Sequence, residues 1–254
     1  MTRILTIVKM SLLENSRKQV FHVLCLLMLA VIVGSTLLCF LTDGVKLKIL
    51  KDLCMTCVLF GGAVISIALA SSGIPNDVEM RTIYPIIARP VTRPHYITGK
   101  YMGTLLTVAM GVIAMSAIFG FLIFSYGGFD TFLITAMGFT LLETAILAAI
   151  ATALSTVATP ALTSIVTFLV FVCGSIKIGY FGEMIKKTES GIPRMAYSLI
   201  YHILPNLECF NLKTALVHHD AVPTAYLLQV AVYGVCYIAF VLFLGSLAFM
   251  RKEV

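Results

Sequence analysis

Long runs of uncharged, mostly apolar residues alternate with short polar stretches along the whole chain. A helix that crosses a membrane needs about 20 such residues, because each residue adds about 1.5 Å to its length. The strands of a membrane barrel would instead alternate polar and apolar residues in segments of about 10. The pattern therefore predicts an all-α integral membrane protein with a single domain, residues 1–254, and six transmembrane helices near residues 20–41, 53–72, 101–126, 131–154, 160–177 and 224–249.

Three regions lie outside the predicted spans. Residues 1–18 are amphipathic, with apolar side chains on one side of a helix, so we expect an N-terminal helix that lies in the membrane interface. Residues 73–100 form a polar connection that is punctuated by prolines, and residues 178–223 form a mixed segment in which we expect helix. Connections of this length are usually functional or interfacial.

Composition strengthens the membrane prediction. The 254 residues are 59% hydrophobic and 12% charged, whereas a soluble domain carries about a quarter charged residues. This excludes an ordinary soluble enzyme, a disordered chain and a secreted disulfide scaffold. The net charge of +6 is located at the ends of the apolar runs, where basic residues set topology and meet anionic lipid, so we expect membrane lipid and no nucleic acid as a partner.

The arginines indicate the orientation. If both termini are cytoplasmic, every arginine except Arg194 falls in a cytoplasmic piece, as the excess of positive charge on that side requires. The lysines divide more evenly between the two sides. The expected protein is therefore multi-pass, with residues 73–100 inside and residues 178–223 outside.

The sequence contains no clear catalytic or metal-binding constellation. His218, His219 and Asp220 are adjacent rather than spaced for one ligand face, which favours solvated loop residues over a metal site. A phosphate-binding loop is also missing, because Pro94 stands where the first glycine before Gly99-Lys100 would be needed. We expect no catalytic residue, metal or cofactor in this chain.

The polar connection at residues 73–100 has the most informative pattern. Asn76 followed by Glu79 is a variant capping box, which predicts a short helix that begins here. Three prolines stiffen the following stretch. Apolar Ile83, Ile86 and Ile87 alternate with arginines, and two interpretations are open: a rigid peg that docks into a groove of another protein, or a solvated loop whose arginines hold topology.

The spacing of Glu79, Thr82, Pro90-Val91-Thr92-Arg93 and Gly99-Lys100 resembles the loop after the second span in type-2 ABC-transporter permeases. The outer sequence from Leu204 to Leu212, the six-span count and the N-terminal helix extend the resemblance over essentially the whole chain. The nearest similarity is to the branch that includes the nitrous-oxide-reductase maturation permeases. Many relatives have glycine where this chain has Arg81.

This resemblance implies a permease subunit, with exporter function, in the bacterial inner membrane. It implies a dimer with a second copy or a related permease, and a separate ATP-binding subunit that holds ATP and Mg. The chain itself would not be an enzyme. The connection between spans two and three would be the coupling helix, whose contact residues are Glu79, Arg81, Thr82, Ile83, Ile86, Ile87, Arg89, Pro90 and Arg93.

One acidic residue, Glu143, falls inside the fourth predicted span. An ionisable group at that depth costs about 2.5–3.5 kcal/mol, so it should face protein or water. It could line the substrate pathway, or pair as a protonated acid with a neighbouring Thr or Ser. Small residues repeat every four positions at Ala145, Ala149 and Ala153, and at Gly99 and Gly103, which favours close helix packing within the subunit over a dimer interface.

Two other functions stay open at this point: an intramembrane lipid-modifying enzyme, and a structural membrane anchor for a cytosolic partner. An enzyme would need acid, base or nucleophilic groups that converge near one interface, and the sequence offers Glu143 and scattered histidines. An anchor would not need residues 178–223. The sequence does not select a substrate.

Overall fold

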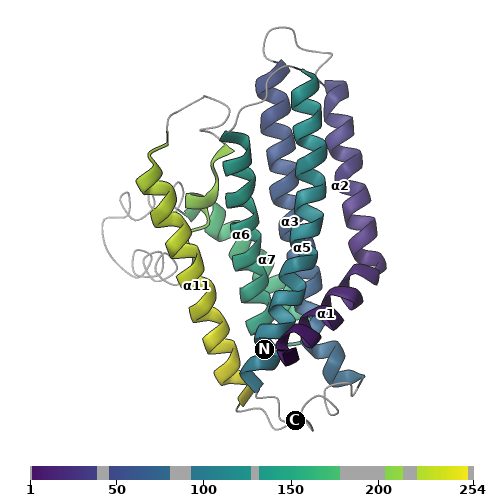
Figure 1. Ribbon diagram of the computed structural model, residues 1–254, viewed down its shortest axis with the longest axis vertical. Helices are drawn as coiled ribbons and strands as arrows, with labels where there is room; N and C mark the ends of the chain where they lie inside the picture. Colours follow the sequence, from purple (N-terminus) through teal and green to yellow (C-terminus); the bar gives the residue numbers. More distant parts are fainter. Residues whose placement is uncertain are drawn as a thin grey trace, which may run out of the picture.

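The computed structural model describes residues 2–38, 46–80, 93–126, 132–177, 204–213 and 222–250. Almost all of these residues are helical, and no strand occurs within these ranges, so the all-α prediction is confirmed. The elements are α1 (Thr2–Arg17), α2 (Gln19–Leu38), α3 (Lys46–Glu79), α5 (Arg93–Ser125), α6 (Phe132–Leu154), α7 (Pro160–Ser175), the 3-10 helix η3 (Glu208–Phe210) and α11 (Thr224–Met250) (Figure 1).

Each predicted span coincides with a helix of the structure. In the part of the chain that the structure describes, four helices are long and apolar enough to cross a membrane: Leu47–Glu79, Pro94–Ser125, Phe132–Leu154 and Thr224–Met250. Helix α7 is apolar but has 16 residues, and α2 has 20. Helices α3 and α5 are longer than predicted, because both continue past the apolar core into the polar connection between them.

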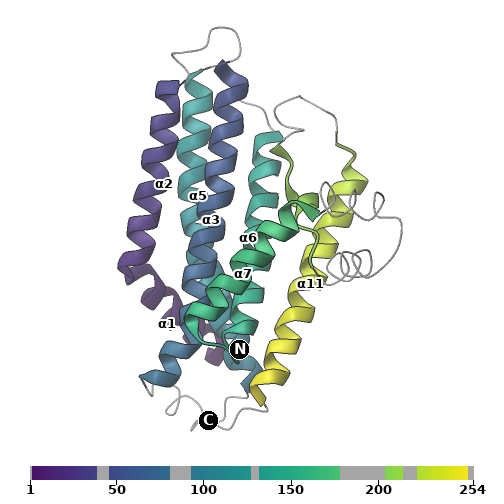
Figure 2. The same cartoon turned by 180° about the vertical axis from the view of Figure 1, so that it is seen from behind.

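The long helices run up and down beside one another (Figures 1 and 2). Helix α6 contacts α3, α5, α7 and α11, and α5 contacts α1, α2, α3, α6 and α11, so both helices lie in the interior of the bundle. We refer to the end that holds α1, the end of α3 and the start of α5 as the base, and to the opposite end as the far end. The turn from α6 to α7 and the end of α11 also lie at the base.

The end of α3 corrects one prediction. Asn76 does not cap a new helix; α3 continues through Pro75 to Glu79, and the backbone N–H of Met80 donates to the carbonyl of Asn76 at 2.9 Å. The reason is tertiary burial, because Ile74 and Asp77 are 2% and 8% exposed against their neighbours. That packing holds the last turn helical despite the hydrogen bond that a proline inside a helix removes.

Candidate functional site

The predicted coupling residues lie mainly between α3 and α5. Glu79 is the exposed last residue of α3, and Arg93 is the first residue of α5. The others, Arg81, Thr82, Ile83, Ile86, Ile87, Arg89 and Pro90, lie outside the described residues. The structure therefore presents the two roots of this segment: the last turn of α3 and the first turns of α5.

A buried group of charges joins these two roots. The Nζ of Lys100 lies 2.9 Å from Oδ2 of Asp77 on α3 and 2.8 Å from Oε2 of Glu14 on α1. The hydroxyl of Tyr96 also donates a hydrogen bond to the Asp77 carboxylate. Lys100 is 6% exposed, so its charge depends on these partners. We call Lys100, Glu14, Asp77 and Tyr96 the Lys100 cluster.

The Glu14 carboxylate is held in its charged form. Burial by itself raises the pKa of Glu14, but the hydrogen bond and the charge of Lys100, and then those of Lys18, lower it by more, so the pKa lies below its usual value. Lys18 reaches Glu14 at 3.4 Å and also donates to the Ser72 hydroxyl of α3 at 3.3 Å. Together with Lys18, the two carboxylates of the cluster thus face two ammonium groups.

Two glycines bring α1 close to α5. A Cβ added at Gly103 would lie 2.5 Å from the Cβ of Ser11, and one added at Gly99 would lie 2.8 Å from Cγ2 of Ile7. No side chain fits at either position without a shift of α1. The expectation that these small residues serve packing within the subunit is confirmed. The same holds for Ala153 of the alanine stripe, which contacts Gly245 of α11.

The opposite side of α1 is exposed and mixes apolar with polar and basic residues. Leu5, Met10 and Leu13 are 63%, 53% and 46% exposed, and Thr6, Lys9 and Arg17 on the same side are exposed as well. A helix with one side on the protein and such a mixed side exposed fits the predicted interfacial position. Ile7 belongs to the apolar side that the sequence predicts with Ile4, Val8 and Leu12, and it packs on Gly99 of α5, so it faces the protein.

The base also contains a groove of about 250 Å³, which lies beside the last turn of α3. It is lined by Pro75, Val78 and Glu79 of α3, by the turn at residues 155–160 and by Phe249 of α11. The ring of Phe249 stacks on Tyr96, with 6.0 Å between ring centroids. The end of α11 therefore covers the Lys100 cluster.

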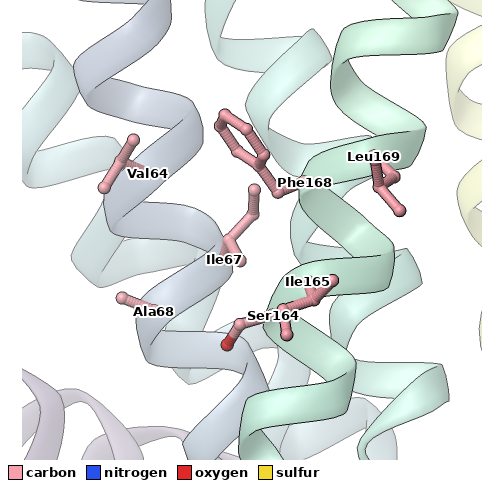
Figure 3. Close-up of a pocket in the computed structure, with 7 residues that line it drawn as sticks. All are labelled: Val64, Ile67, Ala68, Ser164, Ile165, Phe168 and Leu169. Atoms are coloured by element: carbon pink, nitrogen blue, oxygen red, sulfur yellow. The ribbon is translucent and has the colours of Figure 1, made fainter.

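A second groove, of about 440 Å³, lies between α3 and α7 (Figure 3). Apart from one hydroxyl its lining is apolar, and it consists of Val64, Ile67, Ala68, Ser164, Ile165, Phe168 and Leu169. The Ser164 hydroxyl donates to the Ser71 hydroxyl at 2.9 Å, which ties α7 to α3. This groove can offer apolar contact and very little polar recognition.

In the half of the molecule toward the far end, a short segment is inserted between helices. We call residues 204–213 the wedge. Its Leu207 and Phe210 are 0% and 1% exposed and fit against glycines: a Cβ at Gly174 of α7 would meet Leu207 at 3.0 Å, and one at Gly234 of α11 would meet Phe210 at 3.1 Å. Residues 178–203 and 214–221 of the predicted outer segment lie outside the described residues.

Polar contacts hold the rim of the wedge. Lys177, just after α7, donates to the carbonyl of Leu204 at 2.8 Å. Lys213 forms an ion pair with Asp52 of α3 at 3.1 Å and donates to Thr56 at the same distance. The sequence from Leu204 to Leu212 carries part of the family resemblance, but its burial could not be predicted, because the glycines that it packs against are distant in sequence.

Glu143 of α6 is 1% exposed, and its Oε2 has no hydrogen-bond partner among the residues that the structure describes. The neighbouring hydroxyls of Thr140 and Thr144 donate to carbonyls of their own helix, those of Ala136 and Leu141. A role for Glu143 in the pathway or in helix pairing stays a prediction.

No group of three or more His, Cys, Asp or Glu side chains that could hold a metal occurs within the described ranges. His218, His219 and Asp220 lie outside them. Cys54 is fully buried in an apolar cluster with Val58 and Val108, as a small hydrophobic residue would be.

Comparison with known families gives a match over almost the whole chain. The sequence model of the family described as ABC-2 family transporter protein matches residues 5–254. No curated protein matches the chain. The resemblance drawn from the polar connection is confirmed at the level of this family, and its nitrous-oxide-reductase branch stays a prediction.

Proposed function

The chain belongs to the ABC-2 transporter family, and on that premise we propose that it is the permease subunit of an ABC exporter. Its six predicted spans, four of which are the long apolar helices described above, would cross the bacterial inner membrane, with both termini in the cytoplasm. It would work as a dimer, with a second copy or a related permease. Each copy would dock on a separate ATP-binding subunit, which holds ATP and Mg.

The observation that best supports this proposal is the buried charge pair between the roots of residues 81–92. Asp77 and Lys100 fix the end of α3 to the start of α5, so a push on the intervening segment acts on both helices together. If the two helix ends moved independently, a displacement of this segment would not be transmitted to both helices. The partner would favour one of two arrangements of the helices by binding it more tightly when ATP is present.

Helix α3 also forms one wall of the apolar groove in Figure 3. A displacement that begins at Asp77 is therefore carried along the same helix to Val64 and Ile67. This continuity supports a function in which an event at the base changes the shape of a surface deeper in the molecule, as transport requires.

The test is to purify the permease with its ATP-binding subunit. We expect Arg89→Glu and Arg93→Glu to lower the ATP turnover of the complex while the two proteins remain associated, because a reversed charge at the contact weakens the mechanical link. Lys48→Glu, an exposed lysine at the start of α3, is the matched control. Unchanged ATP-coupled transport in both arginine variants would remove the coupling role.

The two alternative functions have no observation in their favour among the described residues. A lipid-modifying enzyme would need acidic, basic and nucleophilic side chains that lie close together near one membrane interface. For a structural anchor, deletion of residues 178–223 should leave function intact, whereas an exporter should lose transport.

A further inference from the structure

We propose that Lys100 is a positioning residue that makes α1 part of the body that moves when the ATP-binding partner acts on the permease. This inference rests on the proposed function and adds α1 to the transmission of force. It assigns a role to a helix that otherwise only lies beside the bundle.

The first step is the position of Lys100 relative to the two roots. Asp77 is in the last turn of α3, and Lys100 is two turns into α5. Their 2.9 Å contact bridges the two helices near the points where force from residues 81–92 would enter. The pair therefore holds the separation of the roots.

The second step is the contact with Glu14. The same Nζ lies 2.8 Å from this carboxylate, so one ammonium group contacts both α1 and α3 from its place on α5. Lys18 also links α1 to α3, but its acceptor on α3 is the neutral Ser72 hydroxyl at 3.3 Å and its side chain is 21% exposed. Lys100 instead contacts a charged carboxylate on each helix, at 2.8 and 2.9 Å, and its side chain is 7% exposed, although that of Glu14 is 33% exposed. Two short charge-assisted contacts make Lys100 the stiffer link.

The third step is the fit of α1 on α5. The close approaches at Gly99 and Gly103, and the hydrogen bond from Asn15 to Thr104 at 3.2 Å, hold α1 flat against the first turns of α5. These contacts fix where α1 lies. The ion pair of Glu14 differs from these contacts, because it ends on Lys100, which is also paired to Asp77 at the root of α3.

The mechanical consequence follows from the exposed side of α1. Leu5, Met10 and Leu13 lie on the exposed side together with Lys9 and Arg17, and this mixture of apolar and basic side chains would rest in the membrane interface. If α1 is fixed to both roots, this side resists movement of the base into or out of the membrane. A push from the partner is then converted into a tilt of α3 and α5.

The experiment uses the complete complex of permease and ATP-binding subunit in lipid nanodiscs, with ATP and vanadate as the probe. Spin labels on unnatural amino acids at Leu13 and Met110, both exposed, report the distance between α1 and α5. Labels at Tyr126 and Thr224 report opening at the far end. In the wild type we expect the first distance to stay constant and the second to shift when nucleotide is trapped.

In Lys100→Ala we expect the first distance distribution to broaden and the shift at the far end to be lost, while the partner stays bound and hydrolyses ATP. Lys100→Arg, which can still contact both carboxylates, should restore both readouts. Lys9→Ala removes an exposed lysine from α1 and should behave as wild type. A full far-end shift in Lys100→Ala would overturn the proposal.

A cross-link makes the test independent of folding defects in Lys100→Ala. A Cβ at Gly99 would lie 3.1 Å from the Cβ of Ile7, within a few tenths of an ångström of disulfide range. When oxidised, the pair Ile7→Cys and Gly99→Cys should narrow the distance distribution between α1 and α5 in the Lys100→Ala background, but it should not restore the far-end shift, because it does not replace the contact of Lys100 with Asp77 of α3. Loss of the shift in the oxidised wild-type background would show that α1 must slide, and would overturn the proposal. Failure of the wild-type permease to bind an ATP-binding subunit would instead overturn the proposed function.

Discussion

The base and the wedge are both attached to α3, but by different physical means. At the base, Lys100 joins three helices through charge contacts at 2.8 and 2.9 Å, with its own side chain 7% exposed, that of Asp77 11% and that of Glu14 33%. At the wedge, buried Leu207 and Phe210 fit against glycines, and the ion pair to Asp52 is partly exposed. Charge contacts constrain both the distance and the relative direction of the helices that they join, whereas apolar packing mainly fills the volume between helices. The base is thus built to keep helices aligned, and the wedge to fill space.

The two regions are connected by one continuous helix. From Asp52 to Asp77, α3 has no break, and at about 1.5 Å per residue the 25 intervening steps span about 38 Å. A change in either region therefore acts on the other through α3. Substitutions that target one region at a time can separate charge from volume as the source of stability.

The largest effect should come from the volume of the wedge. Phe210→Ala removes a ring that is 1% exposed and stacked on Tyr233, and we expect it to lower the free energy of unfolding by about 3–5 kcal/mol. Unfolding in detergent, followed by thermal or denaturant titration, measures this. Phe121→Ala, at a ring that is 70% exposed, is the control, and an equal loss in both would refute the difference.

A slightly smaller loss is expected for the charges of the base. Lys100→Met leaves the Asp77 and Glu14 carboxylates without their shared ammonium group, and we expect a loss of about 3 kcal/mol. Adding Asp77→Asn should recover part of it, because one uncompensated charge is removed, and a double-mutant cycle measures the coupling. Strict additivity of the two substitutions would argue against a charge origin.

Glycine substitutions compare the fit of both regions directly. Gly103→Ala at the base places a methyl group 3.0 Å from the backbone oxygen of Val8, and Gly174→Ala at the wedge places one 3.0 Å from the Leu207 side chain. We expect losses of about 1–3 kcal/mol, larger at Gly103, because a Cβ there would also lie 2.5 Å from the Cβ of Ser11, whereas the nearest atoms at Gly174 are 3.0 Å away. Gly138→Ala meets no atom within 4 Å and should be neutral or stabilising. The reverse ranking would show that α1 shifts easily on α5.

The ion pair of the wedge should matter little. Lys213 and Asp52 have side chains that are 28% and 47% exposed, so Lys213→Ala should change the free energy of unfolding by about 1 kcal/mol or less. The same unfolding assay, at low and high salt, measures the change. A loss as large as that of Lys100→Met would mean that charge, and not volume, holds the wedge.

The smallest effect is the pH dependence of Glu14. Because its pKa in the folded protein is below the value of the unfolded chain, the stabilisation is present above the unfolded pKa, about 4.5, and is lost as the pH falls through the folded pKa. The melting temperature of the wild type should exceed that of Glu14→Gln at pH 7, and the difference should shrink at pH 4. A constant difference would mean that Glu14 acts by packing alone.

The positions of the helices could be predicted from the sequence because each apolar run is local. The end of α3 could not, since Asn76 and Glu79 form a capping pattern and only burial of Ile74 and Asp77 keeps the chain helical. Local preference predicted a new helix, and packing by residues distant in sequence determined the outcome.

The candidate site was predicted only in part for the same reason. The motif indicated Glu79 and Lys100 as parts of one pattern, but Glu14 is 86 positions from Lys100 and carries no signal of its own. The wedge depends likewise on Gly174 and Gly234, which no local pattern relates to Leu207 and Phe210.

The tight turn between α6 and α7 has a consequence for how the protein is made. Residues 155–159 form a short connection, so the two helices make a hairpin that would enter the lipid as one unit during synthesis. Glu143 of α6 would then be inserted together with the strongly apolar α7, whose favourable transfer offsets part of the penalty of the acid. We expect a ribosome-bound chain that ends within α6 to remain poorly inserted until α7 emerges.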